Sequence, residues 1–135
     1  MFEFNSMEER EVRILSPQVL AFVGDGVYSL YIRQKIVLEN HLQGKDLHLQ
    51  VINFVKASGQ SNFIDKLLPM LNEVELSVFK RARNYKTLSQ SKNANIIDYR
   101  RATGLEALIG YLYLIGNEKR LNEILSLSIG EKDEN

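Results

Sequence analysis

Cysteine and tryptophan are absent from this sequence, and proline occurs only twice among its 135 residues. The absence of cysteine excludes a disulfide framework and a zinc site built from thiolates. The only two histidines, His41 and His48, form no recognised zinc site by themselves, so we expect both at the surface. Because few prolines and glycines interrupt the chain and its hydrophobic share is 44%, we expect one ordered domain over residues 1–135.

Long apolar runs are missing as well. The longest candidate, residues 108–115, contains a glycine and two tyrosines and falls far short of the ~20 apolar residues that a bilayer-spanning helix needs. Residues 1–13 carry four glutamates and no apolar segment, so they do not resemble a secretory signal. We therefore expect a cytoplasmic protein without membrane contact, partly disordered at residues 1–13 and 131–135.

The chain has no excess charge of either sign, because 17 basic residues balance 17 acidic ones. The overall field therefore gives no reason to expect binding to nucleic acid. The charges are unevenly distributed, however: residues 80–101, the basic segment, contain seven basic residues and one acidic residue, a net charge of +6. Such a segment suits either a phosphate backbone or a solvated loop. Charge alone favours neither.

Apolar residues recur at helical spacing along most of the chain, and no window shows the alternation of a strand. Ser16 and Pro17 form a good helix start, and Asn72 and Asn117 can cap two later helices. The pattern predicts an all-α fold of about six helices in a single domain. Their expected ranges are 17–39, 46–58, 61–68, 73–83, 99–115 and 117–128. The apolar residues that mark the first of them are Leu20, Val23, Val27, Leu30 and Tyr31.

Several enzyme classes are excluded because their motifs are missing. There is no nucleophile elbow of the kind that serine hydrolases use. Residues 24–26, Gly-Asp-Gly, resemble part of a dinucleotide-binding loop, but they lie inside a predicted helix with no strand before them. A phosphate-cradling loop is absent for the same reason, so a nucleotide-binding enzyme is a poor fit.

Two acidic residues stand out from this background. Asp25 lies between two glycines in a predicted helix, and Glu106 lies in a largely apolar stretch of another. A glycine inside a helix costs on the order of 1 kcal/mol relative to alanine, so Gly24, Gly26 and Gly110 call for an offsetting benefit. Close approach of the two helices would supply it. That approach would also bring the two carboxylates together.

Two converging carboxylates repel each other unless a cation joins them. Mg²⁺ suits such a pair, because it prefers oxygen ligands, keeps several waters and often takes only one or two protein carboxylates. The alternative is that Asp25 is merely solvated and that Glu106 forms an ion pair with Arg33, Arg100 or Arg101. The residues alone leave both interpretations open.

A family resemblance adds to this reading. Residues 20–28, LAFVGDGVY, resemble the first signature of ribonuclease III, and residues 102–110, ATGLEALIG, resemble the second, in the same order and at similar spacing. Residues 48–60, 80–84 and 111–114 are similar to Mini-ribonuclease III in particular. The resemblance implies a dimeric, all-helical endonuclease without a separate double-stranded-RNA-binding domain. It also implies cleavage of duplex RNA to leave 5′-phosphate ends and maturation of 23S ribosomal RNA precursor.

By motif position, Asp25 and Glu106 match the family's two central acids. The resemblance therefore assigns them as catalytic residues and as ligands of Mg²⁺, with Mn²⁺ as a substitute. Further acids of the full-length enzymes are replaced here by Gln18, Ala21 and Thr103, which reduces the metal shell and leaves the number of metal ions open. The same loss supports an alternative function, a non-catalytic helical dimer that binds structured RNA or ribosome precursors. A third alternative, a protein–protein adaptor, leaves the basic segment unexplained.

The missing RNA-binding domain gives the basic segment a role. We expect exposed side chains there to contact phosphates and 2′-hydroxyls of the duplex, with weak sequence preference. A ribosomal protein that helps present the substrate is a further expected partner. Phe22 matches an aromatic residue at the family's dimer contact, with an ordinary core position as the alternative. The expected RNA contacts are Lys80, Arg81, Arg83, Asn84, Lys86 and Lys92.

Overall fold

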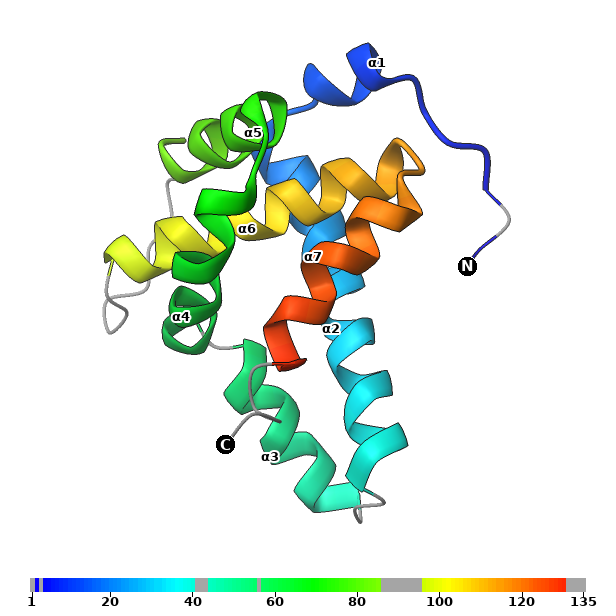
Figure 1. Cartoon of the computed structure of the whole chain (residues 1–135), viewed down its shortest axis with the longest axis vertical. Helices are drawn as coiled ribbons and strands as arrows, with labels where there is room; N and C mark the ends of the chain where they lie inside the picture. The colour runs from blue at the N-terminus through cyan, green and yellow to red at the C-terminus, as the bar shows by residue number, and fades with distance from the viewer. Residues whose placement is uncertain (1, 3, 41–43, 56, 86–95, 131–135) are drawn as a thin grey trace.

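Helices account for all the regular structure in the computed structural model, which describes residues 2, 4–40, 44–55, 57–85 and 96–130 (Figure 1). Within these ranges there is no strand, so the all-α prediction is confirmed, and no helix there is long and apolar enough to cross a bilayer. The elements are α1 (Glu9–Arg13), α2 (Pro17–Asn40), α3 (Gly44–Val55), α4 (Ala57–Leu67), a 3₁₀ turn (Leu68–Met70), α5 (Glu73–Arg83), α6 (Ile96–Leu114) and α7 (Glu118–Gly130).

Helices α2 and α6 cross near the middle of the molecule, and their backbones touch there (Figure 1). A Cβ atom at Gly24 would overlap the carbonyl oxygen of Glu106, and a Cβ atom at Gly110 would overlap the carbonyl oxygen of Leu20. The two glycines therefore permit the close approach that the sequence predicts. Gly26 has no neighbouring atom within 4 Å of an added Cβ, so the prediction that it serves the same approach is wrong.

The hydrophobic core surrounds this crossing. Helices α4 and α5 pack on α6, and α3 packs on α2. Most of α6 is buried, because other helices cover it on several sides. The residues that helical periodicity places on one side of this segment, Ala102, Leu105, Leu108, Ile109 and Leu112, are all buried, and so are Ala107 and Tyr111.

The buried face of α2 agrees only in part with the apolar residues that mark this helix in the sequence: Leu20 is buried, and Val27 and Tyr31 are partly buried against the core. Leu30, one of those residues, is 43% exposed. Apolar side chains occur around much of α2, so their spacing does not decide which of them face the core. The contact at Gly24 decides it, because the buried face must include that position. The buried side chains of α2 are Leu20, Tyr28, Ile32 and Ile36.

Three helix starts agree with the capping residues in the sequence. The Ser16 hydroxyl accepts a backbone N–H from the first turn of α2 at 3.2 Å. Asn72 and Glu75 form a reciprocal capping box at the start of α5. The Asn117 side chain accepts the backbone N–H of Arg120 at 3.2 Å at the start of α7. These short-range hydrogen bonds explain why the beginnings of these helices are predictable.

A buried ion pair joins the first turns of α5 and α7. Glu75 is only 3% exposed, and its carboxylate accepts hydrogen bonds from Arg120 Nε at 2.7 Å and Nη2 at 2.8 Å. The same guanidinium donates to the carbonyl oxygen of Met70 at 2.8 Å. Because two parallel hydrogen bonds fix the relative orientation of the partners, this pair sets the direction in which α7 runs from its first turn.

Two helix boundaries differ from the prediction. The predicted break between helices 46–58 and 61–68 is misplaced, because residues 59 and 60 belong to α4, which runs from Ala57 to Leu67. Helix α6 begins at Ile96, earlier than the predicted start near Tyr99. Neither place carries a proline that would mark the boundary. The predicted loop between residues 85 and 97 lies mostly outside the described residues.

Helix α1 is an addition to the expected elements. A helix of five residues is too short to show a periodicity, which explains why the sequence does not predict it. Val12 is fully buried, and the Tyr111 hydroxyl donates to the Glu9 carboxylate at 2.8 Å. The backbone N–H of Met7 donates to the carbonyl oxygen of Leu114 at 2.9 Å. These contacts attach the segment before α2 to the far end of α6.

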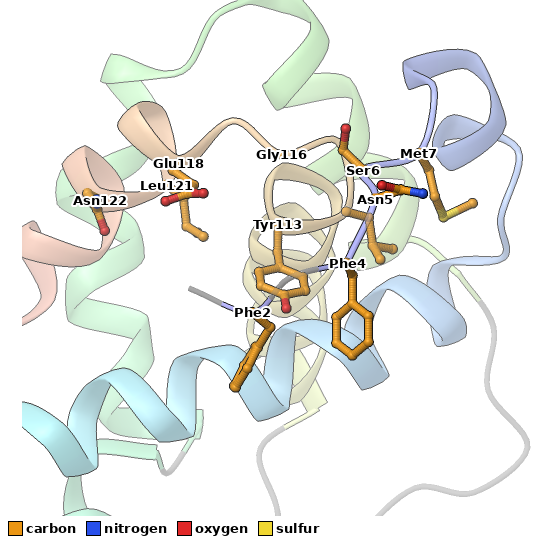
Figure 2. A pocket seen from close by; sticks show the side chains of 11 residues that line it. Phe2, Phe4, Asn5, Ser6, Met7, Tyr113, Gly116, Glu118, Leu121 and Asn122 are labelled. Carbon is orange, nitrogen blue, oxygen red and sulfur yellow. The ribbon is translucent and has the colours of Figure 1, made fainter.

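The residues before α1 line a hollow beside the turn between α6 and α7 (Figure 2). Phe2 and Phe4 are 57% and 79% exposed, and their ring centroids lie 6.3 Å apart. Tyr113 of α6 and Leu121 of α7 also line the hollow. The lining is mostly apolar and includes neither of the two candidate catalytic acids.

The helix crossing generates a stability prediction. Gly24→Ala places a methyl group against the carbonyl of Glu106, which is backbone and cannot rotate away, so we expect a loss of about 3 kcal/mol in the free energy of unfolding. Gly26→Ala is the matched control, and since that position is open and helical we expect a gain of roughly 0.5–1 kcal/mol. Urea unfolding followed by circular dichroism measures both. Equal stability of Gly24→Ala and the parent would show that the helices do not touch there.

Candidate active site

Asp25 and Glu106 meet beside the helix crossing. Asp25 directly follows Gly24, and the backbone of Glu106 lies against that glycine. The two carboxyl groups are close enough to share a hydrogen bond. Asp25 is exposed and Glu106 is half-buried. The structure thus brings together, from two helices about eighty residues apart in sequence, the two acids that the sequence analysis selected.

The electrostatics of this pair call for a positive charge. Burial raises the pKa of Glu106 from 4.5 to about 8, and the charge of Asp25 and the hydrogen bond with it add to the increase. At neutral pH the protonated form of Glu106 is therefore favoured. A cation placed there could replace this proton, because it would remove the repulsion that keeps Glu106 protonated.

The ion-pair alternative for Glu106 finds no support in the described part of the chain. Arg101, one of the candidate partners, pairs with Asp65 at 2.6 Å and thereby joins α6 to α4. Arg33 and Arg100 are exposed. The neighbour that perturbs the Glu106 carboxyl is Asp25, which has the same sign of charge. Glu106 is therefore not held in place as one half of a salt bridge with any of these arginines.

The donor set suits Mg²⁺ with a reduced shell. Gln18 and Ala21 lie on α2 ahead of Asp25, and Thr103 lies one turn before Glu106 on α6. The Thr103 hydroxyl donates to the carbonyl oxygen of Tyr99 at 3.0 Å, so its proton is already committed. The described residues contain no group of three or more acidic or histidine side chains that could enclose a metal. Two carboxylates with open positions fit an ion that keeps water and takes phosphate oxygens.

The expected RNA contacts divide into four groups. Lys80 and Asn84 are exposed at the end of α5. Arg83 lies 6.0 Å from the centre of the Phe79 ring, and its Nε donates to the Asn84 side chain at 3.1 Å, so its guanidinium is held near the surface. The Arg81 guanidinium is bound to backbone groups of the α1–α2 turn. Lys86 and Lys92 lie outside the described residues.

The guanidinium of Arg81 has a structural partner that the sequence analysis missed. It donates to the carbonyl oxygens of Arg13 and Leu15 at 2.9 Å and 3.0 Å and so joins α5 to the turn between α1 and α2. These acceptors are backbone groups 68 and 66 residues away in sequence, so no local pattern could reveal them. Arg81 supports the fold whether or not it also faces RNA.

Phe22 lies on the surface rather than in the core. Its side chain is 81% exposed, one helical turn before Asp25 on α2, and Val19 one turn earlier is 45% exposed. The alternative that Phe22 is an ordinary core residue is therefore wrong. A large aromatic residue in this position is available for contact with another molecule.

Tyr28 is a second residue near the pair whose role the sequence analysis missed. It is 2% exposed and lies one turn after Asp25. Burial raises its pKa to about 12, with smaller effects from a hydrogen bond with Ser128 and from the charge of Glu106. The sequence offered one signal, a tyrosine at position i+3 from Asp25, but not the identity of its partner.

Comparisons with known proteins agree with this architecture. Residues 18–117 match the family model of the Ribonuclease III domain. The chain is 46% identical to a Mini-ribonuclease 3 of Clostridium tetani over 131 residues, which cover 93% of this chain and 84% of that protein. It is 47% identical to a Mini-ribonuclease 3 of Brevibacillus brevis over 116 residues, with coverage of 86% and 87%. A crystal structure of a Fusobacterium nucleatum protein superimposes with a TM-score of 0.79 at 33% identity and covers 90% of this chain and 98% of its own. The chain therefore belongs to the Mini-ribonuclease 3 family of Ribonuclease III domain proteins.

Proposed function

We propose that this protein is a metal-dependent endoribonuclease that cleaves double-stranded RNA, with Asp25 and Glu106 as the ligands of Mg²⁺. The observation that carries the proposal is the pairing of two carboxylates beside a backbone contact between two helices. Two adjacent carboxylates repel each other and reduce stability when no cation is bound. Membership of a ribonuclease family supports the interpretation that they bind a catalytic metal ion. Mn²⁺ offers the same preference for oxygen ligands and should substitute.

The chain's own groups have distinct parts in the proposed reaction. Water attacks a backbone phosphorus, the bond from phosphorus to the 3′-oxygen breaks, and the products carry a 5′-phosphate and a 3′-hydroxyl. When bound, Mg²⁺ supplies Lewis acidity toward water and phosphate oxygens. Asp25 is exposed, so the RNA backbone can approach it directly. Glu106 is half-buried on α6 and contributes a negative charge to the site once it has lost its proton.

The proposed substrate is an RNA duplex held by the basic segment. The exposed cations at the end of α5 support this assignment, because a neutral protein needs a local positive surface to hold a phosphate backbone. Recognition of A-form RNA depends mainly on its shape, so sequence preference should be weak. From the family resemblance, we assign 23S ribosomal RNA precursor in the cytoplasm as the cellular substrate, with a ribosomal protein helping to present it.

A two-fold dimer is the proposed functional unit. Cutting both strands of a duplex requires two active sites with opposite orientations, which a two-fold dimer provides. The exposed Phe22 and its neighbour Val19 lie on the same helix as Asp25, so a contact at these residues would place the two active sites close to the dimer interface. The segment before α2 does not cover Phe22, whose side chain stays 81% exposed.

The catalytic assignment predicts the effect of two isosteric substitutions. Asp25→Asn and Glu106→Gln each remove one charge that Mg²⁺ needs, so we expect cleavage of a long RNA duplex to fall by about 10³-fold or more in each variant. Gel assays with Mg²⁺ or with chelator measure this. Activity of both variants near the parental rate would exclude the two residues as the metal site.

For Glu106→Gln we also predict a stability change of defined sign in metal-free buffer. The folded parent keeps Glu106 protonated up to about pH 8, whereas the unfolded chain loses that proton near pH 4.5, so the parent loses stability as pH rises through this range. Glu106→Gln does not titrate. As pH rises from 4.5 to 8, the melting temperature of the variant should therefore increase relative to that of the parent. In saturating Mg²⁺ the parent should have the higher melting temperature, because only the parent keeps both carboxylates that bind the ion.

The RNA-binding surface is tested by replacing Lys80, Arg83 and Lys86 with serine together. We expect duplex RNA to bind at least about tenfold more weakly, with a salt dependence reduced by up to about 0.9 per lost phosphate contact. Arg81 is left unchanged because its replacement would remove the contacts with the α1–α2 turn. Lys119→Ser, an exposed lysine on α7, is the control. Parental affinity and salt slope in the triple variant would exclude this surface.

The dimer is tested by light scattering at micromolar concentration. The parent should have twice the mass of one chain, and Phe22→Ala should shift the equilibrium toward the monomer, because truncating an aromatic anchor at an interface typically costs about 2 kcal/mol or more. Leu49→Ala is the control, since this residue of α3 is also 60% exposed. A monomeric parent, both free and bound to RNA, would contradict the dimer.

A further inference from the structure

Helices α5 and α6 pack against each other, and a glycine of α6 brings them close (Figure 1). An added Cβ atom at Gly104 would lie 2.9 Å from two ring carbons of Phe79 and 2.9 Å from its carbonyl oxygen, so Phe79 lies directly against α6. Phe79 is fully buried, and Gly104 precedes Glu106 by two residues on the same helix. The Phe79 ring therefore has a fixed position relative to the helix that carries a proposed metal ligand.

Arg83 lies one turn after Phe79 on α5 and is half-buried. The central carbon of its guanidinium is 6.0 Å from the centre of the Phe79 ring, within the range of a cation–π interaction. Its Nε donates to the side-chain oxygen of Asn84 at 3.1 Å. Because a guanidinium is planar, the ring contact and the hydrogen bond at Nε together restrict both its position and its orientation. Arg83 is thus oriented before any RNA binds.

The terminal nitrogens of Arg83 suit a phosphate group. The contact with Asn84 uses only the N–H of Nε, and the N–H groups of Nη1 and Nη2 can donate in parallel to two phosphate oxygens. Its cationic neighbours on α5 differ from it. Nη1 of Arg81 already donates to two backbone carbonyls, and the exposed Lys80 carries a point charge on a flexible stem.

We propose that Arg83 orients the RNA duplex for cleavage, and that Phe79 positions Arg83 for this role. This inference rests on the proposed function. A phosphate bound by Arg83 would be connected to the helix of Glu106 through the Phe79 ring, a path of packed helices without a loop. Hydrolysis needs water, metal ion and phosphorus in alignment, so a fixed contact elsewhere on the same duplex raises the rate as well as the affinity. A flexible lysine contributes mainly to affinity.

The exchange Arg83→Lys separates orientation from charge. Lysine keeps the positive charge but has neither the planar group nor the Nε donor. We expect the maximal rate of duplex cleavage to fall about tenfold, measured in single turnovers with saturating Mg²⁺ and with protein in excess over RNA. The salt dependence of RNA binding should keep the parental slope, because the number of cations that face phosphates is unchanged.

Phe79→Leu tests the positioning step. It removes the ring next to the guanidinium and leaves an apolar side chain in the core, so we expect a similar fall in the maximal rate. In the Arg83→Lys background the same change should have little further effect on the rate, because both substitutions remove one contact. Asn84→Ala removes the acceptor of Nε at an exposed position, without changing the core, and should slow cleavage about threefold.

Arg10→Lys is the matched control, since it makes the same exchange at an exposed arginine of α1, outside the basic segment and the acid pair. Its maximal rate, RNA affinity and salt slope should equal those of the parent. Melting temperatures of all variants show whether each is folded at the assay temperature.

The outcomes separate this inference from the proposed function. A parental maximal rate in Arg83→Lys, whether or not RNA binds more weakly, would show that Arg83 does not orient the duplex, and the proposed function would stand. If Phe79→Leu slows cleavage equally in the parental and Arg83→Lys backgrounds, its effect does not pass through Arg83 and the positioning role is wrong. A parent that does not cut duplex RNA would overturn both the inference and the proposed function.

Discussion

The backbone contact between α2 and α6 is the constraint on which the rest of this structure depends. Gly24 and Gly110 remove the side chains that would separate the helices, so the carbonyl groups of Glu106 and Leu20 approach the opposite backbone directly. The positions of the Asp25 and Glu106 Cα atoms are therefore set by two rigid helices rather than by loops. A site built in this way needs only short side-chain adjustments to bring two carboxylates together, which favours preorganisation.

This arrangement carries a cost that the fold must offset. Glu106 is half-buried beside a group of the same charge, and its raised pKa, about 8, measures how poorly the site accommodates its charged form. The hydrophobic core around the crossing offsets this cost, and it includes the fully buried Leu105 and Leu108 on the same helix as Glu106. The conflict is local, between one acidic pair and an otherwise consistent core. Conflicts of this kind are expected where a protein binds a ligand that relieves them.

Local signals explain which parts of the fold were predictable from the sequence. Ser16, Asn72 and Asn117 satisfy backbone groups within three residues of themselves, so the starts of α2, α5 and α7 follow from short patterns. The pairing of the two acids was predictable because glycines inside helices are costly and mark a close approach. Gly26 shows the limit of that argument, since an equal cost there corresponds to open space.

Long-range contacts explain what the sequence could not predict. The buried face of α2 depends on where α6 crosses it, and the apolar residues around α2 are compatible with more than one choice. Arg81 appears in the sequence as one of several cations in the basic segment, yet its acceptors are backbone carbonyls at Arg13 and Leu15.

The reduced set of acids bears on how the proposed metal site and substrate depend on each other. Two carboxylates leave most coordination positions of Mg²⁺ to water and to phosphate oxygens, so the protein alone should hold the ion loosely. A phosphate of the RNA backbone would then contribute both a ligand and a compensating charge, and metal and duplex would favour each other's binding, since coupling between two ligands is reciprocal. The protein has zero net charge, so neither its local basic surface nor its weak metal site alone should bind the duplex tightly. Coupling between metal and RNA lets the two together provide that affinity. Glu106 matters more in this setting than in a site with additional acids, because the described residues contain no larger group of acidic or histidine side chains that could hold the metal.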